Sequence, residues 1–77
     1  MPFEPDRPAI RARIQHLAIL NGGTKPCADK CEVPVPSLET WLAGRALPGS
    51  VALAKLARGC DVSAHWILFG QEMTRHG

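Results

Sequence analysis

The chain has 77 residues, a formal net charge of +2, 45% hydrophobic residues and three cysteines. This length allows one small domain with a compact core, to which a partner chain would add buried area. No apolar run is long enough for a transmembrane helix, and the acidic, proline-rich start is unlike a secretion signal. We therefore expect one domain in the bacterial cytoplasm or nucleoid, spanning 1–77, with an ordered part of about 6–70 and flexible ends.

The first expected helix follows Asp6, whose carboxylate is a candidate N-cap for the amides of the first turn. Apolar residues recur along it at helical spacing, and the segment 21–23, Asn-Gly-Gly, ends it. The predicted buried stripe consists of Ile10, Ile14, Leu17 and Ala18. Arg7, Arg11 and Arg13 lie largely off that stripe, which indicates a solvated face. The alternative is that one of these arginines contacts a phosphate.

The stretch from Thr24 to Arg45 predicts two short helices joined by a tight turn. Thr24 is the expected N-cap of the first helix, and Gly44 is expected to end the second in the left-handed conformation. The segment 32–34, Glu-Val-Pro, is too short for a loop and unsuited to an unbroken helix. The two apolar stripes are Cys27, Ala28 and Cys31, then Leu38, Trp41 and Leu42. Stripes this close in sequence bury each other best in a helix-turn-helix arrangement.

Cys27 and Cys31 share one face of the first of these two helices, which leaves two interpretations. They are either half of a metal site or a redox pair, or they are two small core residues. The core interpretation is favoured because free cysteine is among the most buried residue types. In addition, no CxxC is present and no histidine lies at zinc-ligand spacing from them. We therefore expect no metal and no cofactor.

Two further helices are expected after a turn at 46–49. Ser50 is the expected N-cap of the fourth helix, and Gly59 is its expected end. Its inward residues are Leu53, Leu56, Ala57 and Cys60. Ser63 is expected to cap the fifth helix, AHWILF, which Gly70 closes.

The fifth helix contains four consecutive apolar residues, from Trp66 to Phe69. They cannot all point inward on one short helix. Either a small domain simply exposes one of them, or Trp66 and Phe69 form a dimer contact. Both interpretations stay open.

The order of these features resembles the phage-repressor helix-turn-helix family, the Cro/CI-like or XRE group that includes lambda repressor. The residues at the family's buried positions are Cys27, Ala28, Cys31, Val33, Leu38 and Trp41. Ala28 matches the small residue of the first motif helix, and Arg45 and Pro48, in GRALP, resemble the usual exit from the second. VSAHWILFG resembles the fifth helix of phage CI repressors. The resemblance covers roughly Ile10 to Gly70.

The resemblance implies an all-α, compact five-helix lambda-repressor-like domain that binds double-stranded DNA sequence-specifically, as a homodimeric transcriptional regulator. Its recognition helix, about 35–42, would enter the major groove. The residues implied to contact DNA are Thr24, Lys25, Val35, Pro36, Ser37, Glu39, Thr40 and Arg45. The chain departs from the family pattern twice. The turn carries Glu32 where the family usually has Gly, and Val35-Pro36 replaces the polar start of the recognition helix.

A second hypothesis is a protein-interaction module, of antitoxin or adaptor type, that keeps the repressor fold without reading DNA. Two features favour it: residues 24–45 carry equal numbers of acidic and basic side chains, and the recognition helix starts with the apolar Val35 and Pro36. An enzyme is not expected, since no catalytic set of residues occurs at meaningful spacing. A small-molecule substrate and a membrane partner are not expected either.

Overall fold

The computed structural model describes residues 6–70, which contain five α-helices and no strand. The helices are α1 (Arg7–Leu20), α2 (Thr24–Cys31), α3 (Val35–Leu42), α4 (Ser50–Cys60) and α5 (Ala64–Phe69). This confirms the predicted compact all-α fold with five helices. The expected flexible ends, 1–5 and 71–77, lie outside the described residues. Within the described part, no helix has the length and apolarity needed to cross a membrane.

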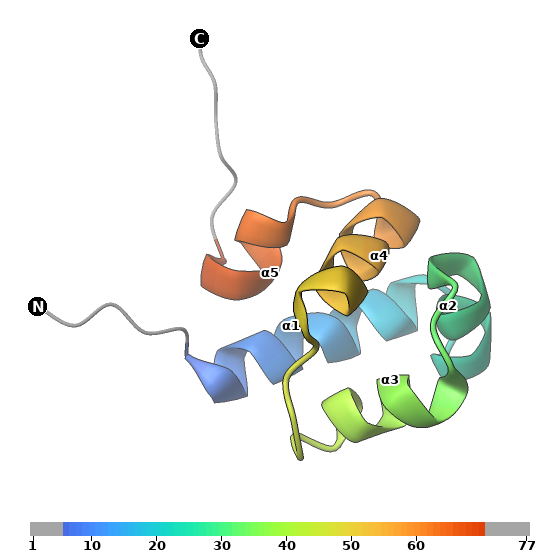
Figure 1. Ribbon diagram of the computed structural model, residues 1–77, viewed down its shortest axis with the longest axis horizontal. Coiled ribbons are helices and arrows are strands. Elements are labelled where there is room, and N and C mark those ends of the chain that lie inside the picture. Colours follow the sequence, from blue (N-terminus) through green and yellow to red (C-terminus); the bar gives the residue numbers. More distant parts are fainter. Residues whose placement is uncertain (1–5, 71–77) are drawn as a thin grey trace, which may run out of the picture.

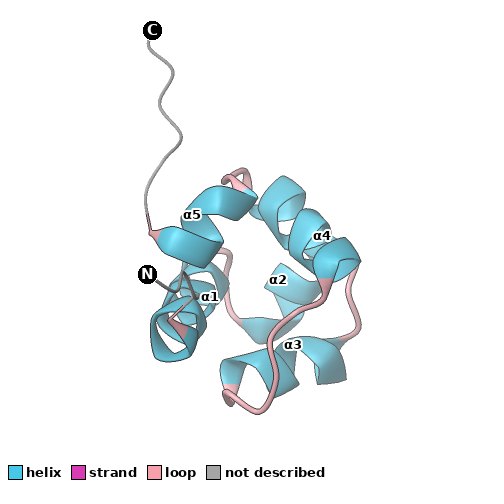
Figure 2. Ribbon diagram, turned by 60° about the vertical axis from the view of Figure 1, so that its left-hand side comes forward, coloured by secondary structure: helices cyan, strands magenta, loops and turns pink. Residues whose placement is uncertain are grey.

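Helix α1 lies across the middle of the molecule and packs against α2, α3 and α5, while α4 packs against α2 and α5 (Figure 1). A turned view shows α1 and α5 on one side and α3 and α4 on the other (Figure 2). The core takes side chains from all five helices and from Val33 in the turn. Its buried residues are Ile10, Ile14, Leu17, Ala18, Cys27, Ala28, Cys31, Val33, Leu38, Trp41, Leu56 and Ile67. The predicted stripes of the first three helices are therefore confirmed, except that Leu42 is half-buried.

Two helices begin as predicted from their capping side chains. The Asp6 carboxylate accepts a hydrogen bond from the Ala9 amide at 3.3 Å, at the start of α1. The Ser63 hydroxyl accepts one from the Trp66 amide at 2.9 Å, at the start of α5. Each side chain satisfies an amide that has no partner within its helix.

The predicted N-caps of α2 and α4 are wrong by one residue. Thr24 and Ser50 are the first helical residues, and Gly23 and Gly49 are the caps. The Gly23 carbonyl accepts the first helical bond from the Cys27 amide, at 3.0 Å. Gly23 has a φ of 113°, which glycine adopts readily, so the chain leaves α1 and enters α2 without a capping side chain.

Residues with a positive φ follow all five helices, and the first is Gly22 after α1, with a φ of 93°. Gly44 and Gly70, both with a φ of 78°, do so after α3 and α5, as predicted. Glu32, with a φ of 60°, ends α2, and Asp61, with a φ of 59°, ends α4. The amide after each of these two residues bonds back to the carbonyl five residues earlier, which is the Schellman arrangement.

Gly59 lies inside α4 and does not end it, which corrects the prediction. A β-carbon at Gly59 would lie 2.6 Å from Cys31 Sγ and 2.7 Å from Cys31 Cα. The glycine is therefore required for close approach of α4 to α2, and not for a turn.

Two arginines of α1 donate hydrogen bonds to carbonyls near the C-terminal ends of α3 and α5. The Arg11 Nε donates to the Leu42 carbonyl at 2.8 Å, and the Arg13 guanidinium donates to the Ile67 carbonyl at 2.9 Å. Arg13 is half-buried, so the predicted solvated face does not describe it. Cations at helix C-termini satisfy carbonyls that lack intrahelical partners and complement the helix dipole.

Candidate functional site

The outer face of α3 is the first candidate site. Leu38 and Trp41 are buried on its inner side, whereas Pro36 and Glu39 are exposed on its outer side. Ser37 and Thr40, both half-buried, lie at the margin. The eight-residue helix therefore presents a mixed, mostly polar face to solvent.

Two of the predicted contact residues on α3 have partners within the protein. The Thr40 hydroxyl donates to the Pro36 carbonyl at 3.0 Å, one turn earlier in the same helix. Its oxygen keeps its lone pairs for an external donor. Val35 is half-buried and packs against the core, so only part of its side chain faces outward.

The turn between α2 and α3 fixes how these two helices meet. It consists of three residues, and the left-handed Glu32 starts it. The Val33 amide donates to the Ala28 carbonyl at 3.0 Å, and the Val33 side chain is buried. Pro34 caps α3 and Pro36 lies in its first turn, where a missing amide proton costs no helical bond.

The residues predicted to contact a phosphate lie before and after α3 in the chain. Lys25 and Arg45 are exposed, and Thr24 is half-buried at the start of α2. Thr24 lines a surface hollow of about 310 Å³ together with Leu42 from the end of α3. The start of α2 and the end of α3 are thus neighbours, with Arg45 three residues further along the chain.

The predicted dimer-contact residues are only partly covered in the monomer. Trp66 is half-buried and packs against the core, whereas Ile67 is fully buried. The half-buried Phe69 ring lies against His65, with ring centroids 5.0 Å apart. Sequence reasoning did not single out Ile19, Leu20 and Val51, which are the large apolar side chains most exposed within residues 6–70.

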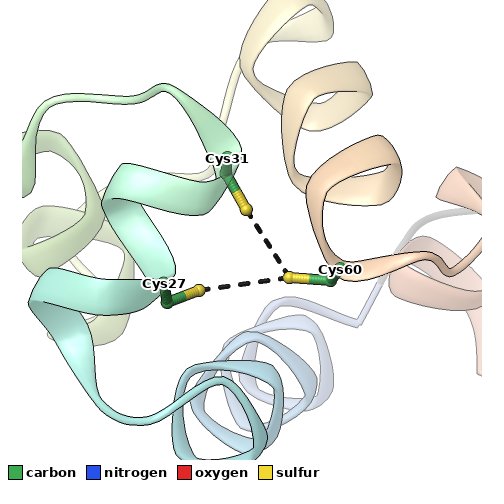
Figure 3. A group of neighbouring side chains, drawn as sticks. All are labelled: Cys27, Cys31 and Cys60. Carbon is green, nitrogen blue, oxygen red and sulfur yellow. Dashed lines mark hydrogen bonds between the residues drawn. The ribbon is translucent and has the colours of Figure 1, made fainter.

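The second candidate site is a cluster of three thiols (Figure 3). Cys27 and Cys31 come from one face of α2, and Cys60 is the last residue of α4. Cys60 Sγ lies 4.0 Å from Cys27 Sγ and 3.6 Å from Cys31 Sγ. The predicted burial of Cys27 and Cys31 is confirmed, with exposed fractions of 1% and 3%, while Cys60 is half-buried. Helical spacing in the sequence places Cys60 on the inner side of its helix, but nothing in the sequence brings it to the other two cysteines.

All three thiols are harder to ionise than a free cysteine. Burial, which disfavours the thiolate, raises the pKa of Cys27 and of Cys60 to about 11, from an ordinary value of 9.0. Burial raises the pKa of Cys31 as well. The nearby Lys30 ammonium acts in the opposite direction, less strongly. At neutral pH the cluster is therefore protonated.

Comparison of the chain with protein-family models, with curated proteins and with solved structures gave no match.

Proposed function

We propose that this chain binds double-stranded DNA sequence-specifically, as a phage-repressor-like transcriptional regulator with α3 as its recognition helix. The observation that carries the proposal is the α2–turn–α3 unit. A three-residue turn that starts with the left-handed Glu32 joins two short helices, and the second buries Leu38 and Trp41 while leaving Pro36 and Glu39 exposed. A helix supported in this way, with one face free, suits insertion into a major groove.

The outward side chains suit a division between base and phosphate contacts. Ser37 and Thr40 offer hydroxyls to base edges or phosphates, and the exposed Glu39 carboxylate offers an acceptor for a cytosine amino group. Val35 offers partial apolar contact to a thymine methyl group. Lys25 and Arg45 carry the positive charge that backbone contacts need. The apolar start of α3 leaves fewer base-reading side chains than is usual for the motif, so DNA shape is expected to contribute to specificity.

The second candidate is a protein-interaction module of antitoxin or adaptor type. It is favoured by the balance of charge over residues 24–45 and by the apolar start of α3, where Val35 and the exposed Pro36 offer no side-chain hydrogen bonds to base edges. The same repressor-like fold would then present the face of α3 to a protein.

The decisive experiment starts with selection of binding sites from random duplexes by the purified protein. Salt titrations of affinity then follow, on the selected and on a random duplex. We expect a clear preference for the selected duplex, and an affinity that falls as salt rises because counterions are released. If no affinity for DNA is measurable even at about 50 mM salt, or if no duplex is preferred, the proposal of sequence-specific DNA binding is wrong. The protein-interaction module is then the remaining candidate.

Variants separate the two kinds of contact. Arg45→Ala should weaken binding to all duplexes and reduce the salt slope by about 1, because a phosphate contact carries little sequence information. Glu39→Ala and Thr40→Ala should instead change the preferred sequence, with a loss of about 1–3 kcal/mol on the original site. Arg58→Ala is the charge-matched control, since that exposed arginine lies on α4 beside Cys31. It should leave affinity and preference unchanged.

A further inference from the structure

The three sulfurs of the thiol cluster are arranged as donors around a single point. All three Sγ atoms lie within 4.8 Å of one another. Sulfur ligands about 2.3 Å from a metal ion are about 4.0 Å apart when three of them surround it in a plane. The separations of 3.6 Å and 4.0 Å from Cys60 Sγ are close to that length, and the third side, between Cys27 and Cys31, is at most 4.8 Å. From this geometry we propose that Cys27, Cys31 and Cys60 form a three-thiolate binding site for a Cu(I) ion.

The number of donors selects the ion. Thiolates are soft ligands that favour Cu(I), zinc or iron–sulfur clusters. Structural zinc sites are almost always four-coordinate, and iron–sulfur clusters generally take four protein ligands. In residues 6–70, no fourth cysteine, histidine or carboxylate joins the group. Three thiolates alone complete the coordination of Cu(I), a soft monovalent ion that, unlike zinc, needs no fourth ligand such as water.

The surroundings of the cluster orient one of the ligands. The Asn21 side-chain amide donates to Cys60 Sγ at 3.5 Å and to the Leu17 carbonyl at 2.7 Å. Its oxygen accepts from the Lys30 ammonium at 3.0 Å, which fixes the orientation of the amide group. Such hydrogen bonds to ligand atoms are typical of metal sites, where they hold the ligand in position.

A polar pocket gives access to the cluster and supplies positive charge. It has a volume of about 490 Å³, and Cys31 lies in its wall. Lys30, Lys55 and Arg58 line the same pocket, where they outnumber the single acidic residue, Glu32. These cations reduce the unfavourable charge of three thiolates around a monovalent ion, since a nearby opposite charge favours the ionised form of a group.

Binding is a simple exchange of protons for metal. Three S–H bonds are replaced by three Cu–S bonds, three protons pass to solvent, and copper remains Cu(I). The ion then joins α2 to α4, two elements that are far apart in sequence. Because the complete ligand set exists only in the folded chain, binding should stabilise the fold. The proposal is independent of DNA binding.

The test is an anaerobic titration of the full chain with Cu(I) against a chromophoric Cu(I) chelator. We expect one ion per chain, an ultraviolet thiolate-to-copper charge-transfer band, a higher thermal midpoint, and three sulfur neighbours by X-ray absorption. Zn(II) is titrated in parallel. A copper stoichiometry above one, fewer than three sulfur neighbours, or tighter binding of Zn(II) than of Cu(I) would overturn the proposal.

Variants locate the site. Cys60→Ser should weaken Cu(I) binding by more than the roughly 10- to 100-fold typical of losing a hydrogen bond to a ligand. Ala54→Ser adds the same hydroxyl to the exposed side of α4 and should bind as the wild type does. Circular dichroism reports whether each variant keeps its helices. Wild-type affinity in Cys60→Ser would also overturn the assignment.

A measurement on the wild type avoids any dependence on folding of the variants. Under conditions that alkylate all three cysteines of the copper-free chain with iodoacetamide, one equivalent of Cu(I) should leave all three unmodified, as counted by mass spectrometry. Protection of two cysteines only would exclude the three-thiolate site.

Discussion

Glu32 and Asp61 hold the same left-handed backbone conformation, although their side chains tolerate it differently. Their φ values are 60° and 59°, and each follows a helix that ends in a Schellman arrangement. The β-carbon makes this conformation unfavourable by about 1–2 kcal/mol for most residues. Asp is among the residues that visit it more readily, because its short side chain can bond locally. Glu32 therefore stores more strain than Asp61.

This difference predicts unequal gains from glycine. Glu32→Gly should raise the free energy of unfolding by about 0.5–1 kcal/mol, which is the relief of strain less the added entropy of the unfolded chain. Asp61→Gly should gain less. Denaturant unfolding of the wild type and both variants measures the two changes. A loss of stability in Glu32→Gly, or a larger gain at Asp61, would contradict the argument.

The packing of α2 against α4 depends on the absence of a side chain at Gly59. A β-carbon there would lie 2.7 Å from the Cys31 α-carbon, which belongs to the backbone and cannot rotate away. Gly59→Ala should therefore push the two helices apart, although alanine has the higher helix propensity. The expected cost is about 1–3 kcal/mol, the usual range for overpacking.

The matched control for this prediction is Gly49→Ala, at the N-cap of the same helix. A β-carbon there meets nothing within 4 Å, so only the weaker capping preference of alanine remains. Thermal unfolding of both variants is the measurement. Equal destabilisation would show that steric contact with α2 is not the cause.

Self-association through α5 is a prediction about the whole molecule. In a dimer of the repressor type, the two recognition helices would meet successive major grooves about 34 Å apart. We predict that Phe69→Glu weakens self-association and DNA binding together, because a charge at an apolar contact must lose its hydration. Helical content should survive, since the core residue of α5 is Ile67.

Ile19→Glu is the control for that prediction. Ile19 is 74% exposed at the end of α1 and offers a separate apolar surface. If α5 forms the dimer, Ile19→Glu leaves the sedimentation behaviour unchanged. If Ile19→Glu dissociates the dimer and Phe69→Glu does not, the interface lies on α1 and not on α5. If the wild type sediments as a monomer both with and without DNA, the dimer is excluded.

Local signals in the sequence determined much of the fold. The periodicity from Ile10 to Ala18 gave the buried stripe of α1, and the segment 32–34 gave the break between α2 and α3. The cap at Ser63 and the glycine at position 70 gave both limits of α5. Each of these features depends on residues that lie within a turn or two of one another along the chain, so it can be predicted from the sequence alone. The predicted DNA contacts followed from the resemblance and stay predictions.

Tertiary structure decided what depends on residues distant in sequence. Gly59 is indistinguishable from a helix-ending glycine until α2 is packed against it, and the partners of Arg11 and Arg13 are carbonyls on α3 and α5. Cys60 lies 29 residues after Cys31, yet their sulfurs are 3.6 Å apart. Helical spacing alone places only Cys27 and Cys31 on a common face. The third thiol joins them because close packing at Gly59 brings the end of α4 onto α2.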